Sequence, residues 1–312
     1  MALTLVEASK YSNDVLLQGI VETFVHEDPI AQRIKFTDIV GNALAYDREI
    51  SEDAAEFYGV NADWNTSERK VDQYTAILKI MGSAAELDHF ITKTRSNVND
   101  VKADLLSGKV KAMNKKFSQS LIYGNATSNP LEFDGMHVLI ASSTYNTIIA
   151  DSGDTQTVPL SVSTHLDVLV DKPKGFTIEG LLMSKNMRRR LTKYLRSISN
   201  LTTDRDQYGM LTEYWGKYPI WASDYVLDTE LTSSGAFSAK TGGLTTSIFA
   251  LSFAEKALEG IQSGMMEVVS WEKVPKTNKE WCQVRWYPSI IMRSLVACAK
   301  VVGLDADGTV AA

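Results

Sequence analysis

Cysteine, excess positive charge and long apolar runs are all scarce in this sequence, and each absence excludes a class of protein. The 312 residues include two cysteines, Cys282 and Cys298, which are too few for a disulfide framework and lack the paired spacing of a zinc site. The 32 basic residues are outnumbered by 38 acidic ones, whereas a protein that coats nucleic acid carries a basic excess. No segment is apolar enough to span a membrane, and the first residues do not resemble a signal peptide. We therefore expect a soluble protein of a reducing compartment.

Motifs that carry catalysis are also missing. Gly242 and Gly243 are not followed by the Lys-Ser/Thr pair of a P-loop, and no GxGxxG motif occurs. The four histidines are scattered, so we interpret them as ordinary surface or half-buried residues rather than metal ligands. Residues 67–70 match the SxxK pattern of serine acyl-enzymes, but the companion motifs are absent. The sequence therefore predicts no enzyme activity, no metal site and no cofactor.

What the sequence does contain begins with an arm and a long hairpin. A capping box at residues 4–7 predicts a helix over residues 5–24. Alternating apolar residues then predict two strands, over residues 40–50 and 74–80, with an acidic tip between them. A two-stranded hairpin is marginal by itself in water. We expect this one to lie on the rest of its own chain or on a neighbouring subunit.

A long helix follows. A capping box at residues 83–86 first predicts a short helix. Residues 99–123 then carry apolar side chains spaced by three and four, with lysines on the other faces. A helix of this length spans roughly 35 Å, which is longer than the usual globular helix. We interpret it as the spine of the molecule.

The remainder predicts a mixed α+β domain. Helices and strands alternate there, over residues 163–170, 176–183, 184–198 and 218–222. A third capping box, at residues 252–255, predicts a helix that ends near residue 264. Residues 266–274 and 281–287 predict a final hairpin. The order of these elements favours an α+β fold over a regular βαβ series.

Charge is segregated along the chain. Residues 47–72 hold eight acids and three bases, residues 93–116 hold seven bases and two acids, and residues 185–196 hold six bases and no acid. An acidic hairpin and two basic helices would make the chain complementary to a copy of itself, and such complementarity fixes register. Two other interpretations stay open, namely solvated faces and contact of a basic helix with a polyanion. The candidate inter-subunit contacts are Glu49, Glu52, Asp53, Glu56, Asp63, Lys109, Lys111, Lys115, Lys116, Arg188, Arg189 and Arg190.

Several short stretches resemble one family. They are the helix end and turn at 121–126, the loop at 129–136, and the segments at 180–188, 214–220 and 284–290. None of these motifs is specific alone, but their order and spacing are similar to those of tailed-phage major capsid proteins, the Hong Kong 97-type coat fold. The resemblance covers nearly the whole chain.

The resemblance implies an α+β Hong Kong 97-type capsid fold in six segments. These would be an N-terminal arm (1–35), an extended-loop hairpin (36–82), a peripheral domain with the spine helix (83–145), an axial domain (146–264), peripheral return strands (265–287), and an axial return with the C-terminal tail (288–312). The implied function is self-assembly, through pentamers and hexamers, into the icosahedral head of a tailed bacteriophage around double-stranded DNA. The chain would belong to the virion, after assembly in the host bacterial cytoplasm.

Partners follow from the same resemblance. Besides copies of itself, they would include a portal, a separate scaffolding protein and optionally a decoration protein, with weak, non-specific contact to packaged DNA and none to a membrane. A separate scaffold, or none, is expected because the fold begins within the first few dozen residues, where many relatives carry a long scaffolding segment. Some relatives crosslink their loop through Lys and Asn. Lys70 is the only lysine of this loop before the return strand, so we do not assign that chemistry.

Three alternatives remain at the level of sequence. An encapsulin-type nanocompartment shell resembles the same fold. A soluble hydrolase with an unrecognised site would show a pocket lined by titratable groups with perturbed pKa values. A tail or adhesion module would form trimers rather than pentamers and hexamers.

Overall fold

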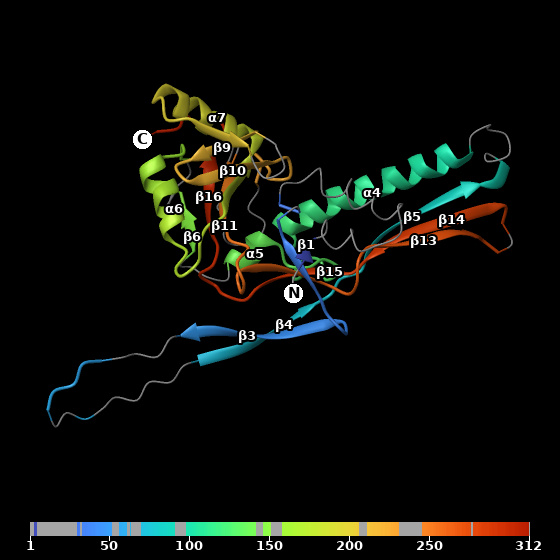
Figure 1. Cartoon of the computed structure of the whole chain (residues 1–312), viewed down its shortest axis with the longest axis horizontal. Coiled ribbons are helices and arrows are strands. Elements are labelled where there is room, and N and C mark those ends of the chain that lie inside the picture. Colours follow the sequence, from blue (N-terminus) through green and yellow to red (C-terminus); the bar gives the residue numbers. More distant parts are fainter. Residues whose placement is uncertain are drawn as a thin grey trace.

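The computed structural model describes residues 3–4, 30–31, 33–51, 56–60, 63, 70–90, 98–141, 146–150, 158–205, 211–230, 245–275 and 277–311. These residues form an elongated molecule that mixes helices with four sheets (Figure 1). A long helix and a three-stranded sheet lie together at one end (Figure 1). At the other end, a seven-stranded sheet and a two-stranded hairpin project as separate lobes (Figure 1).

The helix predicted over residues 99–123 is confirmed as α4, Val98–Tyr123. Its buried apolar side chains include Leu106, Val110, Met113, Phe117 and Leu121. Their spacing by three and four places them on one face, as the sequence pattern predicts. Beside this face lies the sheet of β13 (Glu267–Lys273), β14 (Lys279–Trp286) and β5 (Met81–Asp88). The rings of Phe117 and Trp286 meet there, with centroids 4.9 Å apart.

Two glycines close the turn that follows α4. A Cβ atom on Gly124 would lie 2.4 Å from the carbonyl oxygens of Ser120 and Phe133, and one on Gly135 would lie 2.5 Å from the Ser120 oxygen. The loop therefore returns against the end of the helix only because both side chains are absent. The next helix, α5 (Met136–Ala141), follows this loop and packs in the same core as α4.

Between residues 81 and 90, helical conformation is described only at His89 and Phe90, so the short helix predicted to begin at the capping box of residues 83–86 is wrong in its start. These residues lie in β5, which pairs antiparallel with β14 along its whole length. Ala85 and Leu87 are buried, whereas the intervening Glu86 is exposed, so the burial alternates with a period of two. The backbone pairing with β14 outweighs the local capping signal, and Glu86 accepts a hydrogen bond from Lys279 Nζ at 3.0 Å instead of capping a helix.

The seven-stranded sheet forms the second core. Its order is β6 (Thr147–Ile149), β16 (Ala299–Asp305), β11 (Thr245–Leu251), β7 (Gly180–Ser184), β10 (Tyr218–Ser223), β9 (Leu211–Trp215) and β8 (Thr202–Arg205). One face, with Leu181 and Ile248, packs against the helices formed by residues 162–171 and 185–197. The opposite face, with Leu182 and Phe249, joins the core of α4 and α5. The predicted strand at 176–183 is found, but it begins only at Gly180.

Two predicted helices cover that sheet. The one predicted over residues 163–170 consists of a π-helical turn η1 (Val162–Asp167) that runs into α6 (Val168–Asp171). The basic helix predicted over residues 184–198 is α7, Lys185–Ser197. Ser184 caps α7, because its hydroxyl oxygen accepts the Met187 amide at 3.1 Å. Figure 1 shows η1–α6 and α7 beside the strands of this lobe.

A four-stranded sheet joins the lobes. Its order is β1 (Leu3–Thr4), β2 (Lys35–Asp38), β12 (Leu258–Gln262) and β15 (Pro288–Met292). The capping box predicted at residues 4–7 begins within β1, and the helix predicted over residues 5–24 lies outside the described residues. The final hairpin predicted near 266–287 is confirmed as β13 and β14.

The helix predicted from the capping box at residues 252–255 is also wrong. Lys256 adopts a left-handed conformation, with φ at 69°, which interrupts a right-handed helix in its first turn. Its amide donates to Glu259 Oε1 at 2.8 Å. The chain then enters β12, which lies between β2 and β15 and buries Leu258 and Ile261. Hydrogen bonding of β12 to strands on both sides favours the extended conformation, and the capping box at residues 252–255 carries no information about these distant partners.

Candidate subunit-interface surfaces

The predicted long hairpin is present and is anchored through a buried arginine. It consists of β3 (Ala43–Ser51) and β4 (Lys70–Ile77), paired antiparallel. Arg48 is only 4% exposed, and its Nη2 donates to the Met292 carbonyl at 2.7 Å and to the Tyr46 hydroxyl at 3.2 Å. Its guanidinium also lies 4.4 Å from the ring centre of Tyr74. The base of the hairpin is therefore held on β15 by a charged side chain.

Beyond its base, the described part of the hairpin has no core of its own. Asp47 and Asp72 are exposed, and the apolar side chains of Phe57 and Val60 in the tip are fully exposed, as is that of Val40 just before β3. Among the described residues no third strand pairs with β3 or β4. Figure 1 shows the hairpin projecting away from the seven-stranded sheet and from α4 with its three-stranded sheet. A two-stranded ribbon with exposed apolar residues gains stability only when another surface covers it.

The predicted acidic contacts lie on this hairpin where they are described. Glu56 and Asp63 are both exposed in the tip. Glu49 belongs to β3, although only its backbone is described. Glu52 and Asp53 lie outside the described residues. The structure places none of these acids against a basic helix of its own chain within the described part.

The lysines of α4 are partly neutralised inside the chain. Lys116 Nζ lies 2.6 Å from Glu132 Oε1. Lys102 Nζ lies 2.5 Å from Glu280 Oε2, and this hydrogen bond holds the pKa of Glu280 below its usual value. Lys109 is half-buried, and Lys111 and Lys115 are exposed. These last three form no ion pair with a described acid. Because Lys102 and Lys116 are paired, the positive charge available on α4 is smaller than its sequence indicates.

The available positive charge of α7 is concentrated in one hollow of about 240 Å³. The hollow is lined by Arg188, Arg189, Thr192, Lys193, Arg196 and Glu213. None of its four basic residues forms an ion pair with an acid in the described part of the chain. The carboxylate of Glu213 is instead bonded to the Thr192 hydroxyl, which donates to it at 2.6 Å. Like charges one turn apart destabilise a helix, so this arrangement favours an external anion.

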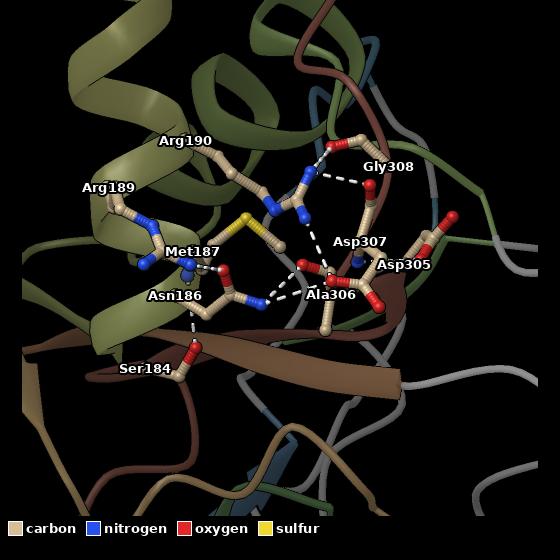
Figure 2. Close-up of polar contacts among 9 residues, drawn as sticks. All are labelled: Ser184, Asn186, Met187, Arg189, Arg190, Asp305, Ala306, Asp307 and Gly308. Atoms are coloured by element: carbon tan, nitrogen blue, oxygen red, sulfur yellow. Dashed lines mark hydrogen bonds and ion pairs between the residues drawn. The ribbon is translucent and has the colours of Figure 1, made fainter.

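Arg190, on the opposite side of α7, is committed to its own chain (Figure 2). Its guanidinium donates to the Asp307 side chain at 2.8 Å and to the Gly308 carbonyl at 2.9 Å. Asn186 Nδ2 donates to the Ala306 carbonyl at 2.8 Å, so both side chains hold the C-terminal segment on α7 (Figure 2). Lys185 pairs similarly with Asp224. Of the three adjacent arginines predicted as contacts, Arg190 is thus the least available to a neighbour.

Neither the cysteines nor any acidic cluster forms a chemical site in the described residues. Cys282 and Cys298 are both buried, and burial raises the pKa of Cys298 to about 12. No group of His, Cys, Asp and Glu in the described ranges is arranged to hold a metal ion. In the same ranges, no helix has the length and apolarity needed to cross a membrane.

One polar cluster escaped the sequence analysis. His137, interpreted there as a surface or half-buried residue, is 7% exposed and lies beside the buried Glu230. Tyr123, Ser247 and Lys300 complete the cluster. No local motif signals it, because its members lie far apart in the chain; His137 and Lys300, for example, are separated by 163 positions.

Comparison with known proteins identifies the fold. No protein-family model and no curated protein matches the sequence. Among solved structures, the SrpI encapsulin complex from Synechococcus elongatus PCC 7942 superposes with a TM-score of 0.66 and 15% identity, covering 99% of this chain and 98% of that one. The capsid of a native GTA particle gives 0.59 and 8%, covering 88% and 89%. Mycobacterium phage Bobi gives 0.56 and 12%, covering 90% and 89%. The chain therefore has the α+β, Hong Kong 97-type capsid fold that the sequence resemblance implies.

Proposed function

We propose that this chain is a shell protein, the major capsid protein of a tailed bacteriophage. Its copies assemble through pentamers and hexamers into an icosahedral head that encloses double-stranded DNA, and the chain has no catalytic role. The observation that carries this proposal is the projecting hairpin, whose exposed apolar and acidic side chains have no core of their own. The Hong Kong 97-type fold over nearly the whole chain supports it.

The energetics of the hairpin favour a neighbouring copy as its partner. Fully burying one large apolar side chain contributes roughly 1.5–3 kcal/mol. The hairpin offers Phe57, Val60 and Val40 for such burial. A head-to-tail contact repeated around a rotation axis closes into rings, so modest contacts suffice when each subunit makes several. In this interpretation residues 36–82 form the extended loop that lies over a neighbour, and residues 1–35 form an arm.

Charge complementarity orients that contact. The exposed acids of the hairpin, among them Asp47, Asp63 and Asp72, face outward, and the hollow on α7 holds four basic residues without a described acidic partner. We assign the hollow as the main basic surface, with Lys109, Lys111 and Lys115 of α4 as a second one. Complementary surfaces of this kind set register and association rate more than they add affinity.

The remaining expectations are part of the same proposal. The peripheral domain comprises residues 83–145 and 265–287, and the axial domain comprises residues 146–264 and 288–312. Assembly takes place in the host cytoplasm with a portal, a separate scaffolding protein and optionally a decoration protein. The net charge of -6 supports only weak, non-specific contact with packaged DNA.

An encapsulin-type compartment is the second candidate, because the SrpI encapsulin complex covers 99% of this chain at a TM-score of 0.66. The contents of the purified particle separate the two candidates. A phage head encloses DNA and absorbs strongly at 260 nm. A compartment contains a cargo protein that is detected by mass spectrometry after disassembly.

Charge reversal tests which surfaces meet. The hollow variant carries R189E, K193E and R196E. The hairpin variant carries D47K, D63K and D72K. We expect each variant alone to lose particles, measured by sedimentation, and the two combined to recover them. The matched control is K217E with K273E, two exposed lysines outside both basic surfaces, which we expect to retain normal particles. Normal particles from the hollow variant, or loss that the hairpin variant does not rescue, would show that these two surfaces do not pair.

A further inference from the structure

A buried carboxylate joins the end of α4 to the seven-stranded sheet. Glu230, on the segment between β10 and β11, has a side chain that is 6% exposed. Its Oε1 accepts a hydrogen bond from the Tyr123 hydroxyl at 2.6 Å, and its Oε2 accepts one from the Ser247 hydroxyl at 2.5 Å. Tyr123 is the last residue of α4 and Ser247 lies on β11. The carboxylate of Glu230 therefore accepts hydrogen bonds from both α4 and the seven-stranded sheet.

Two more side chains enclose this carboxylate. The Nε2 atom of His137, on α5, lies 3.3 Å from Glu230 Oε1. The imidazole stacks on the Tyr123 ring, with centroids 4.9 Å apart, and meets Phe249 edge-on at 4.8 Å. Lys300, on β16, is 0% exposed, and its Nζ donates to the His137 carbonyl at 2.7 Å. The elements α4, α5, β11 and β16 thus meet at one point, which lies centrally in Figure 1.

The Tyr123 hydroxyl is fully used in this arrangement. It donates to Glu230 and accepts the amide of Leu227 at 2.9 Å. The backbone of Glu230 is fixed as well, because its amide donates to the Thr245 carbonyl at 3.0 Å and its carbonyl accepts the Thr245 hydroxyl at 2.6 Å. A buried polar network of this kind specifies one geometry more than it adds stability.

The titratable groups that face Glu230 are Tyr123 from α4, His137 from α5 and Lys300 from β16, with Asp228 nearby on its own segment. Burial lowers the pKa of His137, although Glu230 opposes this shift. Burial also lowers the pKa of Lys300 to about 8 and raises the pKa of Tyr123. Near neutral pH, Lys300 therefore stays mostly protonated while His137 stays uncharged. A proton on His137 would place an additional positive charge in a buried site.

We propose that the Glu230 cluster, defined as Tyr123, His137, Glu230, Ser247 and Lys300, is a proton-responsive joint that fixes the seven-stranded sheet on the end of α4. The joint is closed while His137 is neutral. Acid favours open states in which His137 reaches water, because the closed state binds that proton less well than the open state does. The sign follows from the lowered pKa of His137: its contribution is complete above about pH 6.5, the ordinary histidine value, and is lost as the pH falls below it.

The consequence for assembly rests on the proposed function. In a shell, neighbouring copies would contact both the hairpin end and the sheet end of each subunit. A joint that opens would then change the angle between these contacts and so the geometry of the particle. The joint itself, however, is a property of one chain and is measurable whether or not particles form.

Hydrogen–deuterium exchange at pH 7.0 and 5.5, corrected for the intrinsic pH dependence of exchange, tests the joint on the full chain. We expect protection in residues 120–126, 136–141 and 224–230 to fall by up to about tenfold at pH 5.5. About tenfold is the upper limit, because it is reached only if His137 binds a proton with a pKa of about 6.5 in the open state and none in the closed state. His137→Gln, which keeps a donor but does not titrate, should remove this loss. His165→Gln is the matched control, because His165 is also buried with a lowered pKa but lies in η1, in the part of the chain that packs with the other face of the sheet.

A second variant covers the case in which His137→Gln does not fold. Tyr123→Phe removes one hydroxyl and should increase exchange in the same three segments at both pH values. The proposal is overturned if the wild-type exchange is unchanged between the two pH values, if His137→Gln retains the loss, or if the loss spreads evenly over the sheet. A chain that shows the expected exchange yet never assembles would contradict the proposed function and leave the joint intact.

Discussion

Replacing Arg48 by methionine should release the hairpin from the body of the molecule without unfolding it. Methionine retains an apolar stem but loses the bond to the Met292 carbonyl, the bond to the Tyr46 hydroxyl and the contact with the Tyr74 ring. A hydrogen bond from a charged donor contributes roughly 1.5–3 kcal/mol. A partly desolvated cation–π contact adds about 1 kcal/mol. The cost of burying the guanidinium offsets part of this gain, which leaves about 2 kcal/mol.

A loss of about 2 kcal/mol corresponds to roughly a 30-fold decrease in the ratio of docked to undocked hairpin. Hydrogen–deuterium exchange should therefore accelerate by that factor in residues 43–48 and 71–77, while the buried turns of α4 keep their protection. Lys79→Met is the matched control, because it removes a single exposed bond to the Pro130 carbonyl at the same base. Unchanged exchange in Arg48→Met, or equal acceleration in α4, would refute the assignment of Arg48 as a local anchor.

Further predictions concern the glycines, the hairpin and the buried thiol. Gly124→Ala and Gly135→Ala each force a Cβ to within 2.5 Å of a backbone oxygen and should lower the free energy of unfolding by about 2 kcal/mol or more, measured by urea denaturation. Gly108→Ala, which enters open space within α4, should instead raise it by about 0.5–1 kcal/mol. Deletion of residues 52–69 should abolish closed particles while the circular dichroism spectrum still reports a folded chain, and normal particles from this variant would contradict the role of the hairpin. Cys298 should resist thiol reagents at pH 8 until denaturant is added, because the pKa of its thiol is raised to about 12; rapid native labelling would show that it is not buried.

Periodicity was the most informative sequence signal, because it reflects burial directly. The stripe that includes Val110, Phe117 and Leu121 predicts both the existence and the buried face of α4. The alternation around Tyr46 and Tyr74 likewise predicts β3 and β4, whose strands pair as expected. In both cases the spacing of apolar residues that identifies the element lies within a short window of sequence.

Local capping signals failed where distant strands compete for the backbone. The capping boxes at residues 83–86 and 252–255 satisfy only a few amide groups, whereas β5 and β12 exchange hydrogen bonds with strands from elsewhere in the chain. In the second case the left-handed Lys256 also ends any helical turn. Neither the pairing partner nor the conformation of Lys256 is visible in a short window.

The charge pattern predicted a basic surface on α7, but not which of its basic side chains are engaged within the chain. Six bases in residues 185–196 look equivalent in sequence, yet Arg190 and Lys185 are engaged within the chain, whereas the four lining the hollow form no ion pair with a described acid. The buried partnership of Glu230 with Tyr123 and His137 was not predictable, because the fold alone brings these side chains together. Sequence reports which charges exist, and tertiary structure decides which ones are neutralised.

The central claim is that this chain builds a closed shell. Sedimentation velocity combined with negative-stain electron microscopy of the purified wild-type chain, over a range of concentrations, tests it most directly. We predict regular shells, or rings of five and six subunits, that become more abundant as the concentration rises. A species that stays strictly monomeric at every concentration, with crowding agents and with the proteins encoded beside it, would contradict the claim.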